Sequence, residues 1–167
     1  KVFLTHEEKG REGNTTYIES NFSEIENAIA KVKSKLKDYV NSGNIKKNLL
    51  VVDDSNIIIN YIENIVKENY NVVRANNGIE AINKLNENIY AMLLDINMPK
   101  SNGIDVLKYL TDNDLMDKVP VVIITGNDTK DAIKEVLGYS VLDVLNKPFS
   151  VDNIKRVLSL IENFHNN

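Results

Sequence analysis

The sequence contains no cysteine, no long apolar run and no excess of positive charge. Without cysteine the chain forms neither disulfides nor thiolate metal sites, which suits a reducing cytosol. No run approaches the roughly 18 apolar residues that a membrane-spanning helix needs, and no signal-peptide hydrophobic segment opens the chain. The net charge of −4 argues against nucleic acid as a partner, because phosphate binding needs clustered Lys and Arg. We therefore expect a cytoplasmic protein that binds neither membrane nor nucleic acid directly.

The length of 167 residues, with 43% hydrophobic and 26% charged residues, fits a soluble globular protein. A single core commonly takes about 100 to 150 residues, so one domain and a remainder are expected. The chain begins with Lys1 rather than Met, as a piece of a longer protein would. We place the boundary between a 1–44 extension and a 45–167 domain.

The 1–44 extension contains one predicted helix, at about residues 23–41. Ser23 and Glu26 form a capping-box pattern at its start. Apolar residues then recur every four and three positions, at Ile25, Ile29, Val32, Leu36 and Tyr39. This stripe must bury against the domain or against another chain. The extension is interpreted as a linker, a dimerisation helix or the tail of an upstream domain.

The 45–167 domain alternates short apolar runs with amphipathic segments. The expected strands are 49–52, 71–74, 90–94, 120–124 and 141–145. The expected helices are 56–68, 77–87, 104–112, 128–138 and a last one after Ser150. Continuous apolar strands are typical of a parallel sheet buried on both faces, and right-handed crossovers place helices on both sides. The pattern therefore predicts a doubly wound α/β fold.

Two details of the helices are also expected from the sequence. In the 77–87 helix, the apolar spacing places Ile79, Ile82 and Leu85 on the inward face. His165 lies close to the end of the chain and is expected to be inert in a frayed tail.

Polar residues follow four of the five expected strands. They are Asp53 and Asp54 after the first strand, Asp95 after the third, Thr125 after the fourth and Lys147 after the fifth. Ligands of open α/β sheets bind in the crevice outside the carboxyl ends of the strands. The five side chains are therefore expected to converge on one crevice.

The chemistry of this crevice follows from its charges. Two unit charges about 4 Å apart repel by roughly 4 kcal/mol at an effective dielectric constant near 20, so clustered carboxylates need a cation or shifted pKa values. An all-oxygen site favours Mg²⁺, with Mn²⁺ as a second possibility. A nucleophilic carboxylate, a metal, the Lys147 ammonium and the Thr125 hydroxyl are the parts that phosphoryl transfer requires.

Several short motifs follow one another in order along residues 46–165. They are Asp53-Asp54, Asp95 with Met98-Pro99 and Gly103, Thr125-Gly126, and Lys147-Pro148-Phe149. As a set they resemble the receiver domain of two-component response regulators, in particular the chemotaxis-regulator type. The resemblance implies a flavodoxin-like sheet with strand order 2-1-3-4-5. It also implies a regulatory phosphoprotein of a phosphorelay rather than an enzyme, with a histidine kinase or phosphotransfer protein as partner.

The resemblance assigns roles to individual residues. Asp95 would be the phosphoacceptor, and Asp53 and Asp54 would hold Mg²⁺ together with Asp95 and the backbone carbonyl of Asn97. Thr125 would move to bind a phosphoryl oxygen.

The residues after the fourth and fifth strands would complete the site. Lys147 would pair with the phosphoryl group, and Pro148 would position it through a cis Lys147–Pro148 bond. Gly126 would leave the phosphoryl group open to a partner or water. The family carries an aromatic switch residue three positions before the Lys, and this chain has Val144 there, which puts the usual aromatic readout in doubt.

Two other functions compete with that of a receiver. An aspartyl-phosphate phosphatase of the dehalogenase class needs a carboxylate two residues after its nucleophile, where this chain has Asn97. A pseudo-receiver would act only as an interaction module and would not need the complete acidic and Lys set.

Two further features are the motif around His6 and the surfaces through which the chain could dimerise. The motif around His6 weakly echoes a phosphotransfer histidine, but Gly10 and Gly13 argue against a stable helix there. A homodimer is expected either through the face formed by residues 128–160 or through the N-terminal helix.

Overall fold

The computed structural model describes residues 15–39, 46–85, 88–99, 102–126 and 130–166. The chain divides into two compact units, Lys1–Ile45 and Lys46–Asn167. In the first unit a single helix is described, α2 at Thr15–Tyr39. The second unit holds the sheet and the other helices. It starts one residue after the expected boundary at residue 45, and the assignment of the two parts as domains stays a prediction.

The second unit alternates strands and helices along its whole length. The strands are β1 (Lys47–Val52), β2 (Tyr70–Ala75), β3 (Ile89–Asp95), β4 (Val121–Thr125) and β5 (Asp143–Asn146). The helices are α3 (Asn56–Val66), α4 (Gly78–Lys84), α5 (Gly103–Asp112), α6 (Lys130–Leu137) and α7 (Val151–Asn166).

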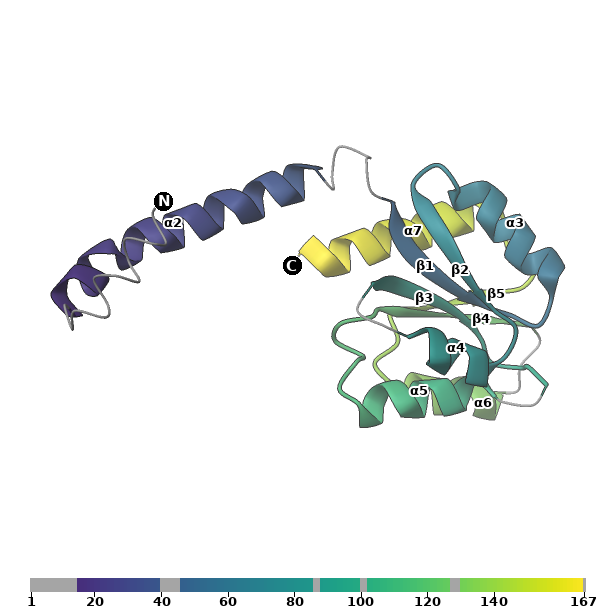
Figure 1. The fold of residues 1–167 in the computed structure, drawn as a ribbon. Helices are drawn as coiled ribbons and strands as arrows, with labels where there is room; N and C mark the ends of the chain where they lie inside the picture. Colours follow the sequence, from purple (N-terminus) through teal and green to yellow (C-terminus); the bar gives the residue numbers. More distant parts are fainter. Residues whose placement is uncertain (1–14, 40–45, 86–87, 100–101, 127–129, 167) are drawn as a thin grey trace. The chain divides into compact units, whose positions relative to one another are not determined.

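The five strands form one parallel sheet in the order β2-β1-β3-β4-β5. Helices α3 and α7 cover one face, and α4, α5 and α6 cover the other (Figure 1). The predicted doubly wound fold and its strand order 2-1-3-4-5 are therefore confirmed. All crossovers pass through helices, so the carboxyl ends of the strands gather along one edge of the sheet.

Alternate residues of the central strands supply two separate cores. Leu50 and Val52 of β1 point into the core beneath α4, α5 and α6, while Leu49 and Val51 point into the core beneath α3 and α7. All four are fully buried. This burial on both faces explains why the strands read as continuous apolar runs rather than alternating ones.

One prediction about the helices is wrong, and another is right only in part. Helix α2 begins at Thr15 rather than near residue 23, so the Ser23–Glu26 pattern lies inside the helix and not at its start. Ile82 of α4 and Leu85 directly after it pack against the core as predicted, but Ile79 is 58% exposed and Ala81 is buried in the core. With only seven residues, α4 turns a narrow face toward the sheet, and apolar spacing alone placed Ile79 on the wrong side of that face.

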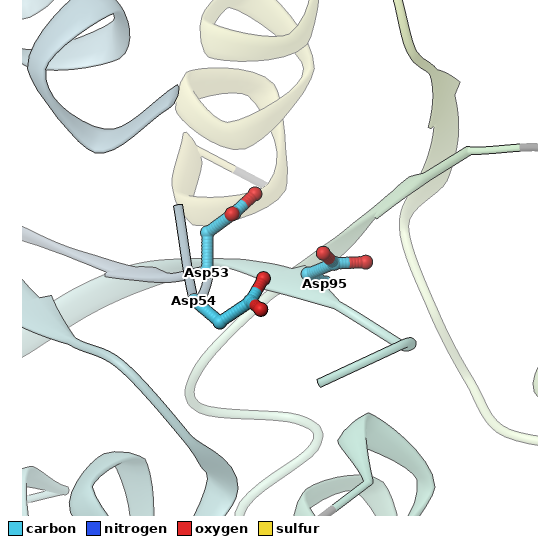
Figure 2. A group of neighbouring side chains, drawn as sticks. All are labelled: Asp53, Asp54 and Asp95. Carbon is cyan, nitrogen blue, oxygen red and sulfur yellow. The ribbon is translucent and has the colours of Figure 1, made fainter. Parts of the chain in front are cut away.

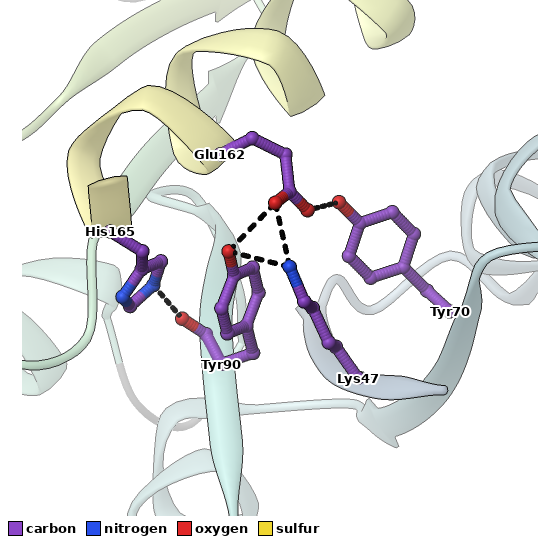
Figure 3. A network of polar contacts seen from close by, with 5 residues as sticks. All are labelled: Lys47, Tyr70, Tyr90, Glu162 and His165. Carbon is purple, nitrogen blue, oxygen red and sulfur yellow. Dashed lines mark hydrogen bonds and ion pairs between the residues drawn. The ribbon is translucent and has the colours of Figure 1, made fainter. Parts of the chain in front are cut away.

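A polar network closes the sheet at the amino ends of its strands (Figure 3). Glu162 of α7 accepts hydrogen bonds from Lys47 (2.6 Å), Tyr90 (3.0 Å) and Tyr70. The Lys47 ammonium also lies 4.1 Å from the centre of the Tyr90 ring. This network joins α7 to the first residues of β1 and β2 and to β3.

His165 extends the same network and does not lie in a frayed tail, so that prediction is wrong. Its ring stacks on Tyr90 with 4.0 Å between the ring centres. Its Nε2 lies 2.9 Å from the backbone oxygen of Tyr90, and because a carbonyl oxygen only accepts, Nε2 donates this bond. His165 and Glu162 are three positions apart on one face of α7, and both reach Tyr90.

Among the described residues, no helix is both long and apolar enough to cross a membrane. The expected location in the cytoplasm stays a prediction. His6 and the residues around it lie outside the described residues.

Candidate functional site

The candidate site lies at the carboxyl edge of the sheet, where four neighbouring strands end. Asp95 is the last residue of β3 and Thr125 the last residue of β4. Asp53 follows β1 directly, and its N–H donates to the Ala75 carbonyl of β2. Lys147 follows β5, and its N–H donates to the Thr125 carbonyl at 2.6 Å. The strand register therefore brings these side chains together, as the sequence predicts.

Three carboxylates form the acidic part of the site (Figure 2). Asp53, Asp54 and Asp95 each offer an oxygen, and these oxygens lie within 4.8 Å of one another. Asp53 is fully buried and Asp95 is 3% exposed, whereas Asp54 is exposed to solvent. Two of the three charges thus sit away from water, where mutual repulsion is poorly screened.

Lys147 is the cation that faces the buried carboxylates. Its Nζ lies 2.6 Å from Oδ2 of Asp95 and 2.8 Å from Oδ2 of Asp53. The Lys147–Pro148 peptide bond is cis, as the sequence predicts, and Pro148 itself is exposed. One ammonium therefore bridges two carboxylates and leaves the cluster with an excess of negative charge.

The pKa values in the site reflect this balance. Burial raises the pKa of Asp95 above its usual range, and repulsion from Asp53 adds to the rise, although the ion pair with Lys147 opposes it. Burial alone would lower the pKa of Lys147, but its contacts with the two carboxylates outweigh burial and raise it. A second positive charge would favour the ionised form of Asp95.

A buried hydroxyl completes the site. Thr125 is fully buried, and its Oγ1 has no hydrogen-bond partner among the described residues. A buried hydroxyl without a partner is unusual, because its desolvation is not compensated. Beside it, a Cβ built on Gly126 would meet no atom of the described residues within 4 Å, so none of them closes this side of the site.

The loop after Asp95 is held close to it by Gly103. A Cβ at Gly103 would lie 2.4 Å from the backbone oxygen of Asp95 and 2.8 Å from Cα of Ile96. The Gly103 N–H also donates to the Ile96 carbonyl. Sequence reasoning noted this glycine only as part of a motif and missed its role, because close backbone approach leaves no signal in composition or periodicity.

The remaining predicted site residues also lie near this edge. The Asn97 N–H donates to Oδ1 of Asp95 at 3.2 Å, which places the Asn97 backbone next to the carboxylate. Val144 lies in β5, half-buried against the core beneath α4, α5 and α6. The roles expected of Asn97, Val144, Gly126 and Pro148 stay predictions.

Comparison with known proteins agrees with this geometry. Residues 49–159 match the response regulator receiver domain family. The chain belongs to this family. It is 38% identical over 117 residues to a protein named transcriptional regulatory protein CpxR homolog of Haemophilus influenzae, covering 66% of this chain and 49% of that protein. It is 32% identical over 117 residues to chemotaxis protein CheY1 of Helicobacter pylori, covering 68% of this chain and 94% of that protein.

Solved structures of receiver domains share the fold. The CheY-like response regulator receiver domain protein of Methanospirillum hungatei aligns with a TM-score of 0.64 and 25% identity, over 74% of this chain and all of that chain. A Francisella receiver domain aligns with a TM-score of 0.60 and 32% identity, over 71% and 98% of the two chains. The chain spans about half the length of the CpxR relatives and nearly all of the chemotaxis relative.

The receiver family binds Mg²⁺ at an acidic cluster, and the residues of this chain fit such an ion. The site offers only oxygen ligands, which Mg²⁺ prefers, and its two buried carboxylates share a single ammonium. Asp54 is exposed beside them, so the cluster has an open side toward solvent. The donor set and the uncompensated charge therefore both suit a hard divalent cation.

Proposed function

We propose that this receiver domain accepts a phosphoryl group on Asp95 and signals through the resulting change in shape. The observation that carries the proposal is the position of Lys147, whose Nζ lies within 2.8 Å of both Asp95 and Asp53. The same ammonium can pair with the Asp95 carboxylate before the reaction and with the phosphoryl oxygens after it. In this role Lys147 neutralises the charge and fixes its position.

In the proposed reaction, a carboxylate oxygen of Asp95 attacks the phosphorus of a phosphohistidine on a kinase or phosphotransfer protein. A P–O bond to Asp95 forms as the P–N bond breaks, and the imidazole nitrogen keeps the electron pair. Asp53, Asp54, Asp95 and the backbone carbonyl of Asn97 would hold Mg²⁺, which supplies charge neutralisation at the phosphoryl oxygens. The Thr125 hydroxyl would donate a hydrogen bond to one of those oxygens, which gives it the partner it lacks among the described residues.

Asp95→Asn is the direct test of the phosphoacceptor. We expect the wild-type chain to take up one phosphoryl group from acetyl phosphate in the presence of Mg²⁺, with acetate as leaving group, as measured by intact mass. Asp95→Asn and chelation of Mg²⁺ should each abolish this uptake. An Asp95→Asn variant that is still phosphorylated at the same rate would refute the assignment.

The same experiment separates the competing functions. One labile phosphoryl group per chain indicates a switch, and slow loss of that group would show self-dephosphorylation. Continuous release of phosphate at a high rate would indicate an enzyme instead. No uptake at all would indicate a pseudo-receiver. The complete set of Asp53, Asp95, Thr125 and Lys147 at one edge favours the switch.

A homodimer is also proposed, through the face formed by residues 128–160 or through the N-terminal helix. The histidine kinase that would phosphorylate this domain and the target that would receive its signal are properties of the whole protein. The names of the relatives describe those proteins only.

A further inference from the structure

Helix α2 carries an apolar stripe that is exposed from Ile29 to Tyr39 and half-buried at Ile25. Ile29, Val32, Leu36 and Tyr39 are between 49% and 58% exposed. In the sequence the same spacing continues back through Ile25 and Phe22 to Ile18, so the repeat runs along most of the helix. An isolated helix of this length is marginal in water, and an apolar seam repeated over three heptads is typical of helices that pair.

The order of apolar residues along the seam is informative. The spacing assigns Phe22, Ile29 and Leu36 to heptad position a, and Ile18, Ile25, Val32 and Tyr39 to position d. Parallel two-stranded coiled coils favour β-branched residues at a and Leu at d. Here Leu36 occupies an a position and the β-branched Ile25 and Val32 occupy d positions. The seam therefore lacks the pattern of a parallel dimer.

The charges of α2 are segregated along its length. Residues 15–28 contain three Glu and no Lys or Arg, whereas residues 29–39 contain four Lys and one Asp. No Lys or Arg stands three or four positions from any of these Glu in the sequence, so helical i,i+3 and i,i+4 pairing does not explain the arrangement. The first turn contains no acidic residue, and Lys37 is the only one of the four Lys that lies in the last turn, so the helix dipole accounts for Lys37 but not for the rest of the arrangement.

We propose that α2 pairs with α2 of a second copy of this chain in antiparallel orientation. This orientation sets the acidic half of one helix against the basic half of the other, whereas parallel pairing would align like charges. It also pairs a positions with d positions, joining Ile25 to Leu36 and Ile29 to Val32 of the second copy. Glu26 and Lys33 both flank the seam at position e, so each would face the other across the two-fold axis.

This proposal makes the N-terminal helix the dimer surface and does not depend on phosphorylation. Asp95→Asn should dimerise like the wild type, so failure of the dimer and failure of the phosphoacceptor are distinguishable.

Disulfide cross-linking of the full 167-residue chain tests the orientation, because the natural sequence has no cysteine. Ile25→Cys and Leu36→Cys variants are mixed, oxidised and analysed by intact mass. The expected main product joins one chain of each variant. In a parallel pair the two positions are 11 residues apart, about 16 Å along the axis, so each variant would link only to itself. Self-linked products, equal amounts of all products or no cross-linking would overturn the proposal.

Charge variants test the pairing independently. Lys33→Glu would turn two attractions into two repulsions, and we expect the dimer dissociation constant from sedimentation equilibrium to rise about tenfold. The double variant Glu26→Lys/Lys33→Glu should restore the wild-type value. Lys31→Glu is the matched control, because it makes the same charge change at position c, away from the seam. Equal weakening by Lys31→Glu and Lys33→Glu, no rescue in the double variant, or a wild-type chain that stays monomeric would contradict the proposal.

Discussion

The close approach of Gly103 to the backbone of Asp95 makes a quantitative prediction. Real Cβ atoms do not come within 3.0 Å of such neighbours, and a Cβ at Gly103 would lie 2.4 Å from the Asp95 oxygen. Gly103→Ala must therefore separate α5 from the end of β3 by at least 0.6 Å, the difference between these distances. Both obstructing groups are backbone atoms, so no side chain can turn aside.

We expect Gly103→Ala to lower the free energy of unfolding by about 1 to 3 kcal/mol, the usual cost of overpacking. For a domain of this size the melting temperature would fall by about 3 to 12 °C, as measured by circular dichroism. The displaced segment carries Asp95, the proposed phosphoacceptor, and misplacement of a reacting group by about 1 Å can cost up to 100-fold in rate. Phosphorylation by acetyl phosphate should therefore slow at least tenfold in the same variant.

Gly126→Ala is the matched control, since it makes the same substitution at the same edge of the sheet. Within the part of the chain that the structure describes, a Cβ at Gly126 meets nothing within 4 Å. Its free energy of unfolding should change by no more than about 0.5 kcal/mol. If Gly103→Ala melted within 1 °C of the wild type and was phosphorylated at the wild-type rate, the inferred close approach would be wrong.

Two further predictions concern a buried hydroxyl and the network around α7. Thr125→Val should leave the melting temperature unchanged or raise it, because the hydroxyl has no partner among the described residues. The same variant should be phosphorylated more slowly. A large loss of stability would contradict the absence of a partner for the hydroxyl. Glu162→Gln should lower the free energy of unfolding by about 1 kcal/mol at pH 7. Glu63 is an equally exposed glutamate, and in the described contacts it pairs only with Arg74, so Glu63→Gln should lower the free energy of unfolding by less. Burial would raise the pKa of Glu162, but its hydrogen bonds outweigh burial and lower it. Its contribution is therefore complete above the unfolded pKa and is lost as pH falls through the folded one. If urea titrations at pH 3 showed the same loss of unfolding free energy for Glu162→Gln as at pH 7, the loss would not come from the ionised carboxylate.

The fold was predictable because its signals are local and repeated. Continuous apolar strands such as Leu49–Val52 alternate with amphipathic helices, and only a parallel sheet with helices on both faces buries such runs. The convergence of Asp53, Asp95, Thr125 and Lys147 followed from the same reasoning, since each closes a strand at one edge of the sheet.

What the sequence did not reveal depends on contacts between distant residues. The network of Lys47, Tyr70, Tyr90 and Glu162 joins three strands and α7 (Figure 3). In the sequence, nothing distinguishes any one of these residues from an ordinary surface residue. The position of His165 near the chain end predicts fraying, whereas its ring packs on Tyr90, a contact that the local sequence does not indicate. The exposed side of Ile79 could not be separated from a buried one by spacing in so short a helix.

We expect the candidate site to lower the stability of the protein near pH 7 when no cation is bound. Because the pKa of Asp95 is raised, its contribution to stability is complete only below the unfolded value and is lost as pH rises through the folded one. Near pH 7 the ionised Asp95 carboxylate therefore lowers the free energy of unfolding, and the ion pair with Lys147 offsets this loss only in part. A divalent cation that binds the folded site alone would recover this cost by mass action. The network around Glu162 lies at the other end of the strands, away from the acidic cluster. We therefore expect removal of a divalent cation to affect the charged edge of the sheet and to leave the contacts of Glu162 in place, as measured by hydrogen exchange.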